Sequence, residues 1–147
     1  MELIERAGFL DSLRNRFERI AKGEGHCILI TGEAGIGKTS LVNAFCRERE
    51  KDCKIFHGTC DSLFTPRPLA PLYDIALQMS NDFMQHHWDQ ADRTALFTSF
   101  LQELGNQKEA VVIVFEDIHW ADEATLDFIK FLARRITRVS CLFILTY

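Results

Sequence analysis

One eight-residue stretch near the N-terminus constrains this chain more than any other. Residues 32–39 read G-E-A-G-I-G-K-T and match the pattern G-x-x-x-x-G-K-[ST] at every fixed position. The run 27–31 before it is apolar and rich in β-branched residues, which predicts a buried parallel strand. The residues after it have helical spacing as far as about Lys51. Strand, glycine-rich loop and helix in this order are the context in which the pattern binds phosphate groups.

Residue types within this stretch indicate its chemistry. Glycines let the backbone come close to a ligand, so the loop N–H groups can converge on a polyphosphate at the positive end of the following helix. Lys38 is a compact cation suited to the β- and γ-phosphates, and the Thr39 hydroxyl is suited to Mg²⁺. The predicted nucleotide-binding residues are Gly32, Glu33, Ala34, Gly35, Ile36, Gly37, Lys38, Thr39 and Ser40. A chance match or a degenerate copy is the alternative, and the flanking elements argue against it.

Two acids follow the most β-prone segment of the chain. Residues 110–115 read A-V-V-I-V-F, which predicts a central parallel strand buried on both faces, and Glu116 and Asp117 come directly after it. Ligands of parallel sheets bind beyond the carboxyl ends of the strands. We therefore expect these two acids to meet Mg²⁺ and an attacking water molecule. A pair of surface acids that merely ends a strand is the alternative.

Predicted strands alternate with helical segments along the whole chain. The strands are expected at 27–31, 54–60, 110–115 and 140–147. The helices are expected at about 5–21, from the glycine-rich loop to Lys51, and at 69–84, 93–104 and 122–136. In the last of these, Leu126, Ile129, Ala133 and Ile136 are expected to face the core. The alternation predicts an α/β fold with a parallel sheet between two helical layers.

Composition narrows the function classes. The 147 residues are one domain by size, and a net charge of −4 does not indicate a nucleic-acid surface. Neither a membrane-length apolar run nor a signal peptide is evident, so we expect a cytoplasmic location without membrane contact. The five cysteines contain no C-x-x-C pair, which favours reduced, structural thiols. The adjacent histidines 86–87 are interpreted as a surface helix end, because neighbours in sequence do not share a helix face.

Three stretches together resemble a known family. They are the glycine-rich loop 32–39, the segment 58–72 with G-T-C-D and P-L-A-P-L, and the segment 114–122 with V-F-E-D-I-H-W-A-D. The chain resembles the AAA-like ATPase module of the signal-transducing ATPases with numerous domains (STAND). It is most similar to the large ATP-binding regulators of the LuxR type and to their relatives beside adenylate cyclases and protein kinases. The resemblance covers nearly the whole chain.

The resemblance implies a P-loop NTPase of the ASCE or AAA-like class, with α/β/α layers and the strand order 5-1-4-3-2. The chain would supply the first four strands of a domain over 1–147 that is truncated after the fourth strand. ATP and Mg²⁺ would be its cofactors, with Thr39 and Glu116 on the metal and Asp117 activating water. The division of labour between the two acids stays open, because many relatives have aspartate at the first position. Arg6 lies where relatives approach the adenine, and an ordinary surface residue is the alternative.

The function that we expect is an ATP-binding switch, with slow hydrolysis at most, inside a larger signalling or transcriptional regulator. A turnover ATPase such as a kinase or motor, and a scaffold without hydrolysis, are the alternatives. ATP is favoured over GTP because the chain has no N-K-x-D segment and no glycine three residues after Asp117. The expected partners are the nucleotide, C-terminal domains of the full-length protein, and a second copy at the exposed edge of the strand 27–31. Direct nucleic-acid contact is not expected.

Overall fold

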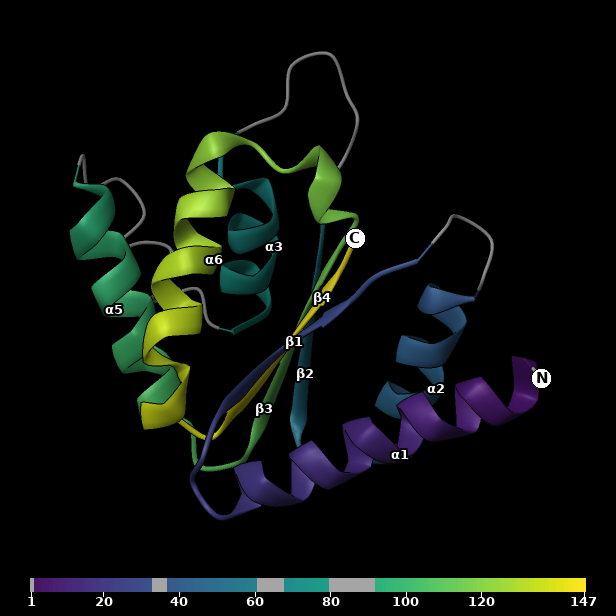
Figure 1. Ribbon diagram of the computed structural model, residues 1–147. Helices are drawn as coiled ribbons and strands as arrows, with labels where there is room; N and C mark the ends of the chain where they lie inside the picture. Colours follow the sequence, from purple (N-terminus) through teal and green to yellow (C-terminus); the bar gives the residue numbers. More distant parts are fainter. Residues whose placement is uncertain (1, 33–36, 61–67, 80–91) are drawn as a thin grey trace.

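The computed structural model describes residues 2–32, 37–60, 68–79 and 92–147. Its centre is a four-stranded parallel sheet (Figure 1) in the order β1-β4-β3-β2. The strands are β1 (His26–Ile30), β2 (Lys54–Thr59), β3 (Val111–Glu116) and β4 (Cys141–Thr146). Each strand begins and ends within one residue of its prediction. The predicted α/β fold is confirmed, and the order of these four strands is the one that the resemblance implies.

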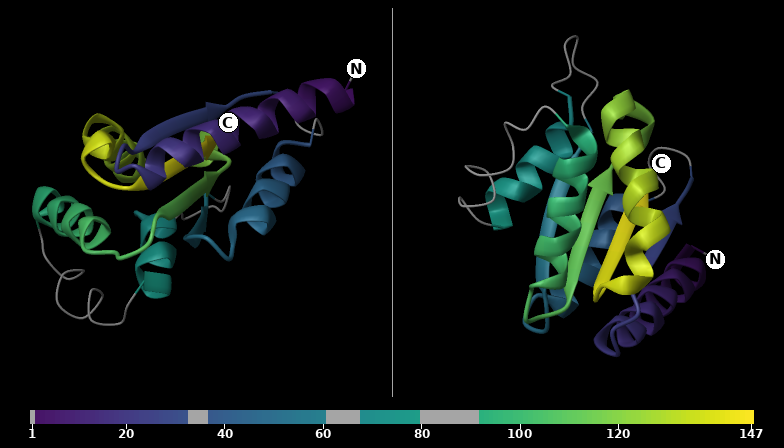
Figure 2. Two further views of the ribbon diagram at one scale, coloured as in Figure 1. Left: turned by 90° about the horizontal axis from the view of Figure 1, so that it is seen from below. Right: turned by 90° about the vertical axis from the view of Figure 1, so that its left-hand side faces the viewer.

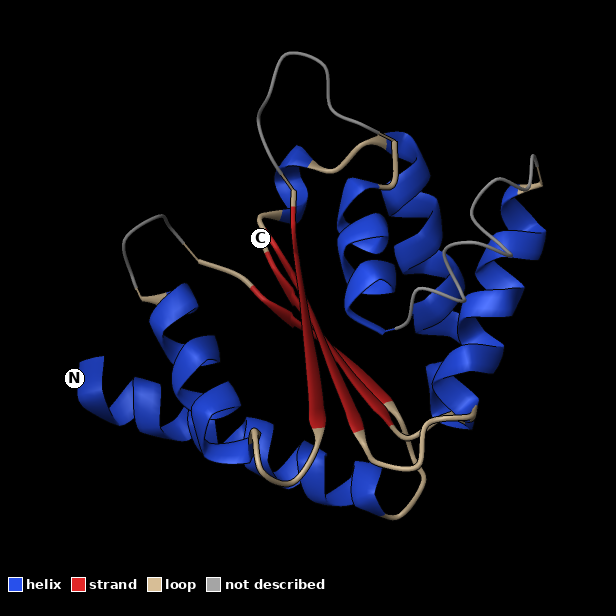
Figure 3. Ribbon diagram, turned by 180° about the vertical axis from the view of Figure 1, so that it is seen from behind, coloured by secondary structure: helices blue, strands red, loops and turns tan. Residues whose placement is uncertain are grey.

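Helices cover both faces of this sheet, as Figure 2 and Figure 3 show. One face carries α1 (Glu2–Ala21) and α2 (Lys38–Arg49). The other face carries α3 (Ala70–Met79), α5 (Arg93–Gly105) and α6 (Glu123–Arg135). Two short 3₁₀ turns, η1 (Ile118–Trp120) and η2 (Ile136–Arg138), flank α6. The histidines 86–87, the end of the helix predicted at 69–84 and loop residues 33–36 lie outside the described residues.

Alternation along β3 decides which face each of its side chains meets. Val112 and Val114 lie in the core between the sheet and α1 and α2, while Val111, Ile113 and Phe115 lie in the core beneath α3, α5 and α6. All residues of β4 and the first five of β3 are buried, as expected for central parallel strands. By the same alternation Glu116, which ends β3, belongs to the α2 side of the sheet.

The expected burial of the first strand is wrong. Leu29 of β1 is 54% exposed, and only Ile30 of this strand is buried. The cause is position, because β1 pairs with β4 on one side and is an edge of the described sheet. An apolar run predicts a buried strand only when neighbours cover it, and the edge position that the resemblance implies accounts for the exposure.

The expected inner face of α6 is also partly wrong. Ile129 and Ile136 are buried as predicted, but Leu126 and Ala133 are exposed. The face of α6 that packs against the core includes Phe128 and Leu132, which are fully buried. Both stripes have helical spacing, and the one with the larger apolar side chains faces the core because it removes more apolar area from water.

The segments 58–72 and 114–122, which carry the family resemblance, contact each other at the carboxyl end of the sheet. A Cβ on Gly58 would lie 2.7 Å from the carbonyl oxygen of Pro71, so β2 and α3 approach this closely only with glycine there. The Leu69 N–H donates to Asp122 at 3.4 Å, and Asp122 also caps α6 by accepting from the Thr125 N–H at 3.2 Å. These contacts fix the start of α3 and the segment that joins β3 to α6. No helix in the described ranges is long and apolar enough to span a membrane.

Candidate nucleotide-binding site

A cavity of about 740 Å³ is lined by residues from the carboxyl ends of the strands and from the N-terminus of α2. It is lined by Gly32, Gly37, Lys38, Thr39, Ser40, Asp117, His119, Trp120 and Tyr147. The structure therefore brings the described residues of the predicted phosphate loop together with one of the two predicted acids. Glu33, Ala34, Gly35 and Ile36 lie outside the described residues.

Gly37 sets the entry to α2. Its backbone is left-handed, with φ 85° and ψ 25°, a conformation that glycine adopts without the steric cost of a side chain. It also caps the helix, because the Leu41 N–H donates to the Gly37 carbonyl at 2.9 Å. The N–H groups of the first turn have no partner within the helix, so this terminus can receive an anion.

Lys38, the first residue of α2, directs its ammonium back towards the loop. Its Nζ donates to the carbonyl of Gly32 at 2.6 Å and to the main-chain oxygen of Tyr147, the last residue of the given sequence. The ammonium therefore lies between the end of β1 and the end of β4, at the floor of the cavity. A phosphate oxygen entering here would take the place of one or both carbonyls as its acceptor.

Asp117 is held at the end of β3 in an unusual conformation. Its backbone has φ 57° and ψ 49°, a left-handed geometry that costs a non-glycine residue about 1 kcal/mol, although Asp and Asn tolerate it better than most residues. Its N–H donates to Thr146 Oγ1 at 3.0 Å, and its carbonyl accepts from the Trp120 N–H at 2.9 Å. These bonds aim the exposed side chain of Asp117 at the cavity.

Glu116 occupies a different environment from Asp117. Its side chain is half-buried, and its Oε1 is buried without a hydrogen-bond partner among the described residues. The charge of Glu116 also contributes, after burial, to the raised pKa of Cys46 on α2, so the two side chains share one side of the sheet. A buried carboxylate oxygen without a donor suits a cation. Together with the Thr39 hydroxyl at the start of α2, it fits a hard ion such as Mg²⁺.

Three aromatic rings form a rim that the sequence did not predict as part of the site. His119 lies 5.2 Å from Trp120 and 5.7 Å from Tyr147 between ring centroids. Trp120 and Tyr147 are 52% and 56% exposed. Thr146, the buried acceptor for the Asp117 N–H, was missed as well. The signals available were the unusual H-W pair after the acids, and a hydroxyl at the carboxyl end of an apolar strand.

None of the five cysteines, all of which lie among the described residues, forms a disulfide, and four of them are buried. Within the described ranges, no group of three or more histidine, cysteine or acidic side chains could hold a metal ion. This search concerns protein-only cages, whereas a magnesium ion at Thr39 and Glu116 would complete its shell with phosphate oxygens and water.

Comparison with known proteins identifies the family. The model of the AAA ATPase domain matches residues 2–144, and the chain belongs to this family. A curated relative, hybrid signal transduction histidine kinase G of Dictyostelium discoideum, is 30% identical over 80 residues. That match covers 54% of this chain and 2% of the relative, so the chain spans a small part of that protein.

Solved structures support the fold. A chain in a structure of Drosophila ORC bound to DNA has a TM-score of 0.58 at 12% identity, over 95% of this chain and 78% of that one. A chain in Drosophila ORC bound to AT-rich DNA and Cdc6 has a TM-score of 0.59 at 12% identity, over 99% of this chain and 50% of that one. At this identity the likeness concerns the fold alone.

Proposed function

We propose that this chain is the ATP-binding switch domain of a larger signalling or transcriptional regulator, with slow hydrolysis of ATP at most. The observation that carries the proposal is the single cavity that gathers Gly37, Lys38, Thr39 and Asp117. Membership of the AAA ATPase domain family supports nucleotide as the ligand. The name of the curated relative supports a signalling context. The whole chain, 1–147, would act as one domain of the longer protein.

In this proposal each residue of the site has a distinct task. The loop 32–37 and the first N–H groups of α2 hold the phosphate oxygens, and Lys38 contacts the β- and γ-phosphates. Thr39 and Glu116 would hold Mg²⁺, which neutralises charge on the phosphates when bound. Asp117 orients the attacking water, because its carboxylate is exposed on the cavity while that of Glu116 is half-buried.

The contacts of Lys38 support a switch. To hold a phosphate, its ammonium must release the carbonyl of Gly32 or share itself with it. The cavity that holds Lys38 is also lined by His119 and Trp120, whose rings are in contact, so a change at the ammonium takes place beside an exposed aromatic rim. A nucleotide-dependent change at the surface is what a downstream domain could detect.

Two other functions remain as alternatives. A turnover ATPase of the motor type is favoured by the position of Asp117 on the cavity, and multiple turnovers stimulated by assembly would support it. A scaffold without nucleotide is disfavoured by Lys38, Thr39 and the acidic pair, all of which are present. The DNA bound in the Drosophila ORC structures belongs to those assemblies, and a net charge of −4 gives this chain no evident nucleic-acid surface.

Calorimetric titration with ATP and GTP, each with and without Mg²⁺, tests the proposed function. We expect saturable binding of ATP that strengthens with Mg²⁺, and binding of GTP that is at least about tenfold weaker, which corresponds to about 1.4 kcal/mol. Equal or tighter binding of GTP would contradict the choice of base. An affinity that Mg²⁺ leaves unchanged would contradict the role given to Thr39 and Glu116.

We also propose that the free edge of β1 associates with a second copy of the chain. Leu29 is exposed on this edge, and the open edge of a strand is a template for pairing. Leu29→Lys should weaken self-association by about tenfold, because a buried leucine contributes about 1.5–3 kcal/mol. Sedimentation velocity over a concentration series measures this. The matched control is Leu126→Lys on α6, which is also exposed, and equal effects of the two changes would exclude the β1 edge.

A further inference from the structure

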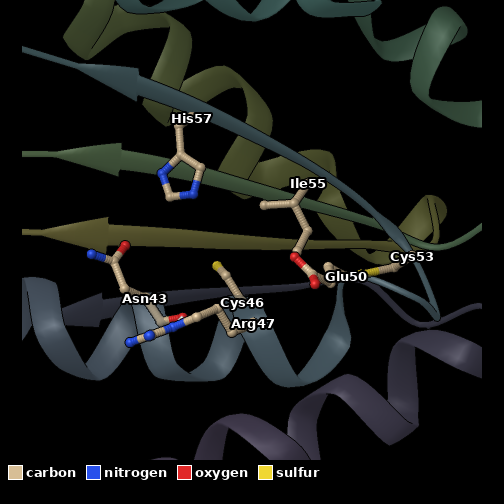
Figure 4. Close-up of a pocket in the computed structure, with 7 residues that line it drawn as sticks. All are labelled: Asn43, Cys46, Arg47, Glu50, Cys53, Ile55 and His57. Atoms are coloured by element: carbon tan, nitrogen blue, oxygen red, sulfur yellow. The ribbon is translucent and has the colours of Figure 1, made fainter.

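A second hollow, of about 730 Å³, lies on the α2 side of the sheet and outside the nucleotide cavity. Figure 4 shows it as a trough between α2 and β2. The residues that line it are Asn43, Cys46 and Arg47 of α2, Glu50 and Cys53 from the segment between α2 and β2, and Ile55 and His57 of β2. Its volume lies within the range of small-molecule sites in proteins, about 300–1,000 Å³.

Two opposite charges line this trough, those of Arg47 and Glu50. Arg47 uses its Nε to donate to the Asn43 carbonyl within the helix, at 3.4 Å. Neither Arg47 nor Glu50 takes part in an ion pair with a described residue, although Glu48 is bound by Arg14 and Arg49 lies 3.7 Å from Asp52. Glu48 and Arg49, which lie between Arg47 and Glu50 in the chain, therefore have ionic partners, whereas Arg47 and Glu50 have none among the described residues and are available to a ligand.

The floor of the trough is apolar. Cys46 and Cys53 are buried, and burial raises the pKa of the Cys46 thiol to about 12 and that of the Cys53 thiol to about 11. Both thiols therefore stay protonated at neutral pH, and that of Cys53 donates to the Arg49 carbonyl at 3.2 Å, so neither adds a charge to the trough. In Figure 4 the sulfur of Cys46 points into the gap between Ile55 and the ring of His57. An apolar group of a ligand would rest here.

The outer edge of β2 is closed at this level, which argues against a strand as the occupant. The His57 N–H donates to Gln78 Oε1 at 3.2 Å, and Gln78 Nε2 donates to the His57 carbonyl at 3.0 Å. The side-chain amide of Gln78 thus satisfies both backbone groups of His57 that an added strand would need. A small molecule with its own charges fits the trough better than an extended peptide does.

We propose that the trough binds a small zwitterion of the apolar α-amino-acid class. Its carboxylate pairs with Arg47, its ammonium pairs with Glu50, and its side chain covers the floor between α2 and β2. Glu50 follows Arg47 by three positions, and the backbone of Glu50 continues the right-handed turn of α2, so the two residues are about 4.5 Å apart along the helix axis. Both side chains line the same trough, so one amino acid lying in it can offer its carboxylate to Arg47 and its ammonium to Glu50.

The position of the trough also gives this ligand a route to the nucleotide site. Arg47 and Glu50 lie at the end of α2, the helix that begins with Lys38 and Thr39, and Cys46 shares its side of the sheet with Glu116. A ligand wedged between α2 and β2 would shift the helix that holds the phosphate-binding residues. We expect occupancy of the trough to change the affinity for ATP, and this second step rests on the proposed function.

The test titrates the protein with L-leucine and no nucleotide, followed by calorimetry and by NMR shifts of residues 43–57. Saturable binding is expected, and Arg47→Gln or Glu50→Gln should each weaken it by about tenfold or more, as expected for loss of a charged partner. The matched controls, Arg134→Gln on α6 and Glu18→Gln on α1, alter exposed charges elsewhere and should leave it unchanged. No saturable binding of leucine, or equal binding by all four variants, would overturn the proposal.

Three leucine analogues test the ligand class. The compound 4-methylpentanoate lacks the ammonium, 3-methylbutylamine lacks the carboxylate, and N-acetyl-leucinamide represents an uncharged polypeptide segment. Each should bind at least about tenfold more weakly than leucine. If any of them binds as tightly, the zwitterion assignment is wrong, and tight binding of the amide would indicate a peptide instead. A separate ATP titration with saturating leucine tests the coupling, so its failure leaves the amino-acid site standing.

Discussion

Lys38→Ala should raise the dissociation constant for ATP by at least about 100-fold. A charge-assisted hydrogen bond contributes about 1.5–3 kcal/mol, and this ammonium is positioned to contact two phosphates. Calorimetric titration with ATP and Mg²⁺ measures the loss. The effect should be specific to the site, because the partners of Lys38 in the structure are backbone carbonyls that water can replace.

Lys130→Ala is the matched control for this change. Lys130 is an exposed lysine on α6, on the opposite face of the sheet from α2, and its removal should leave ATP affinity unchanged. Circular dichroism and the thermal midpoint of both variants should stay near those of the parent chain. Retention of the parent affinity by Lys38→Ala would exclude the cavity at the start of α2 as the phosphate site.

The sequence predicts the secondary structure well because the strong patterns are local. Apolar runs of five to seven residues define β3 and β4, and Asp122 marks the start of α6 through the cap that the structure contains. Burial is less local. Leu29 looks like a core residue by its neighbours in sequence, and it is exposed because β1 is an edge, a property of the strand order.

Only part of the candidate site can be derived from the sequence. Features formed by residues close together in the chain are predictable, and contacts between distant residues are not. The loop motif and the acids were identified from short patterns. The hydrogen bond from Lys38 to the main-chain oxygen of Tyr147 joins residues 109 positions apart, and no local sequence pattern predicts it. The left-handed backbone of Asp117 depends on a hydroxyl from Thr146 in another strand.

The trough beside α2 illustrates a second limit. Asn43, Arg47 and Glu50 are polar residues on the outer side of an amphipathic helix, a pattern that ordinarily indicates a solvated surface. Their significance depends on where β2 lies and on which charges are already paired. Which charges form ion pairs depends on the tertiary structure. Arg14 on α1 pairs with Glu48 on α2, while Arg47 pairs with no described carboxylate.

Substitutions of the two acids should differ in their effects, one lowering the rate of ATP hydrolysis and the other the affinity for ATP with Mg²⁺. Asp117→Asn should retain ATP affinity within about threefold and lower the rate of hydrolysis by about 10²–10⁴-fold, the usual contribution of a positioned acid–base group. Asparagine is the appropriate replacement because it removes the negative charge and tolerates the left-handed backbone of this position. An alanine there would confound the loss of the carboxylate with backbone strain.

Glu116→Gln should act instead through the metal. Its half-buried carboxylate has an oxygen without a donor, so the amide would remove the charge that a cation needs while it keeps the shape. We expect ATP affinity to fall by about tenfold in the presence of Mg²⁺ and to change little in its absence, about the effect of one charged ligand. Titrations at several Mg²⁺ concentrations, with single-turnover hydrolysis, measure both variants. If Asp117→Asn proved to be the magnesium-sensitive variant and Glu116→Gln the one defective in hydrolysis alone, the two roles would have to be exchanged.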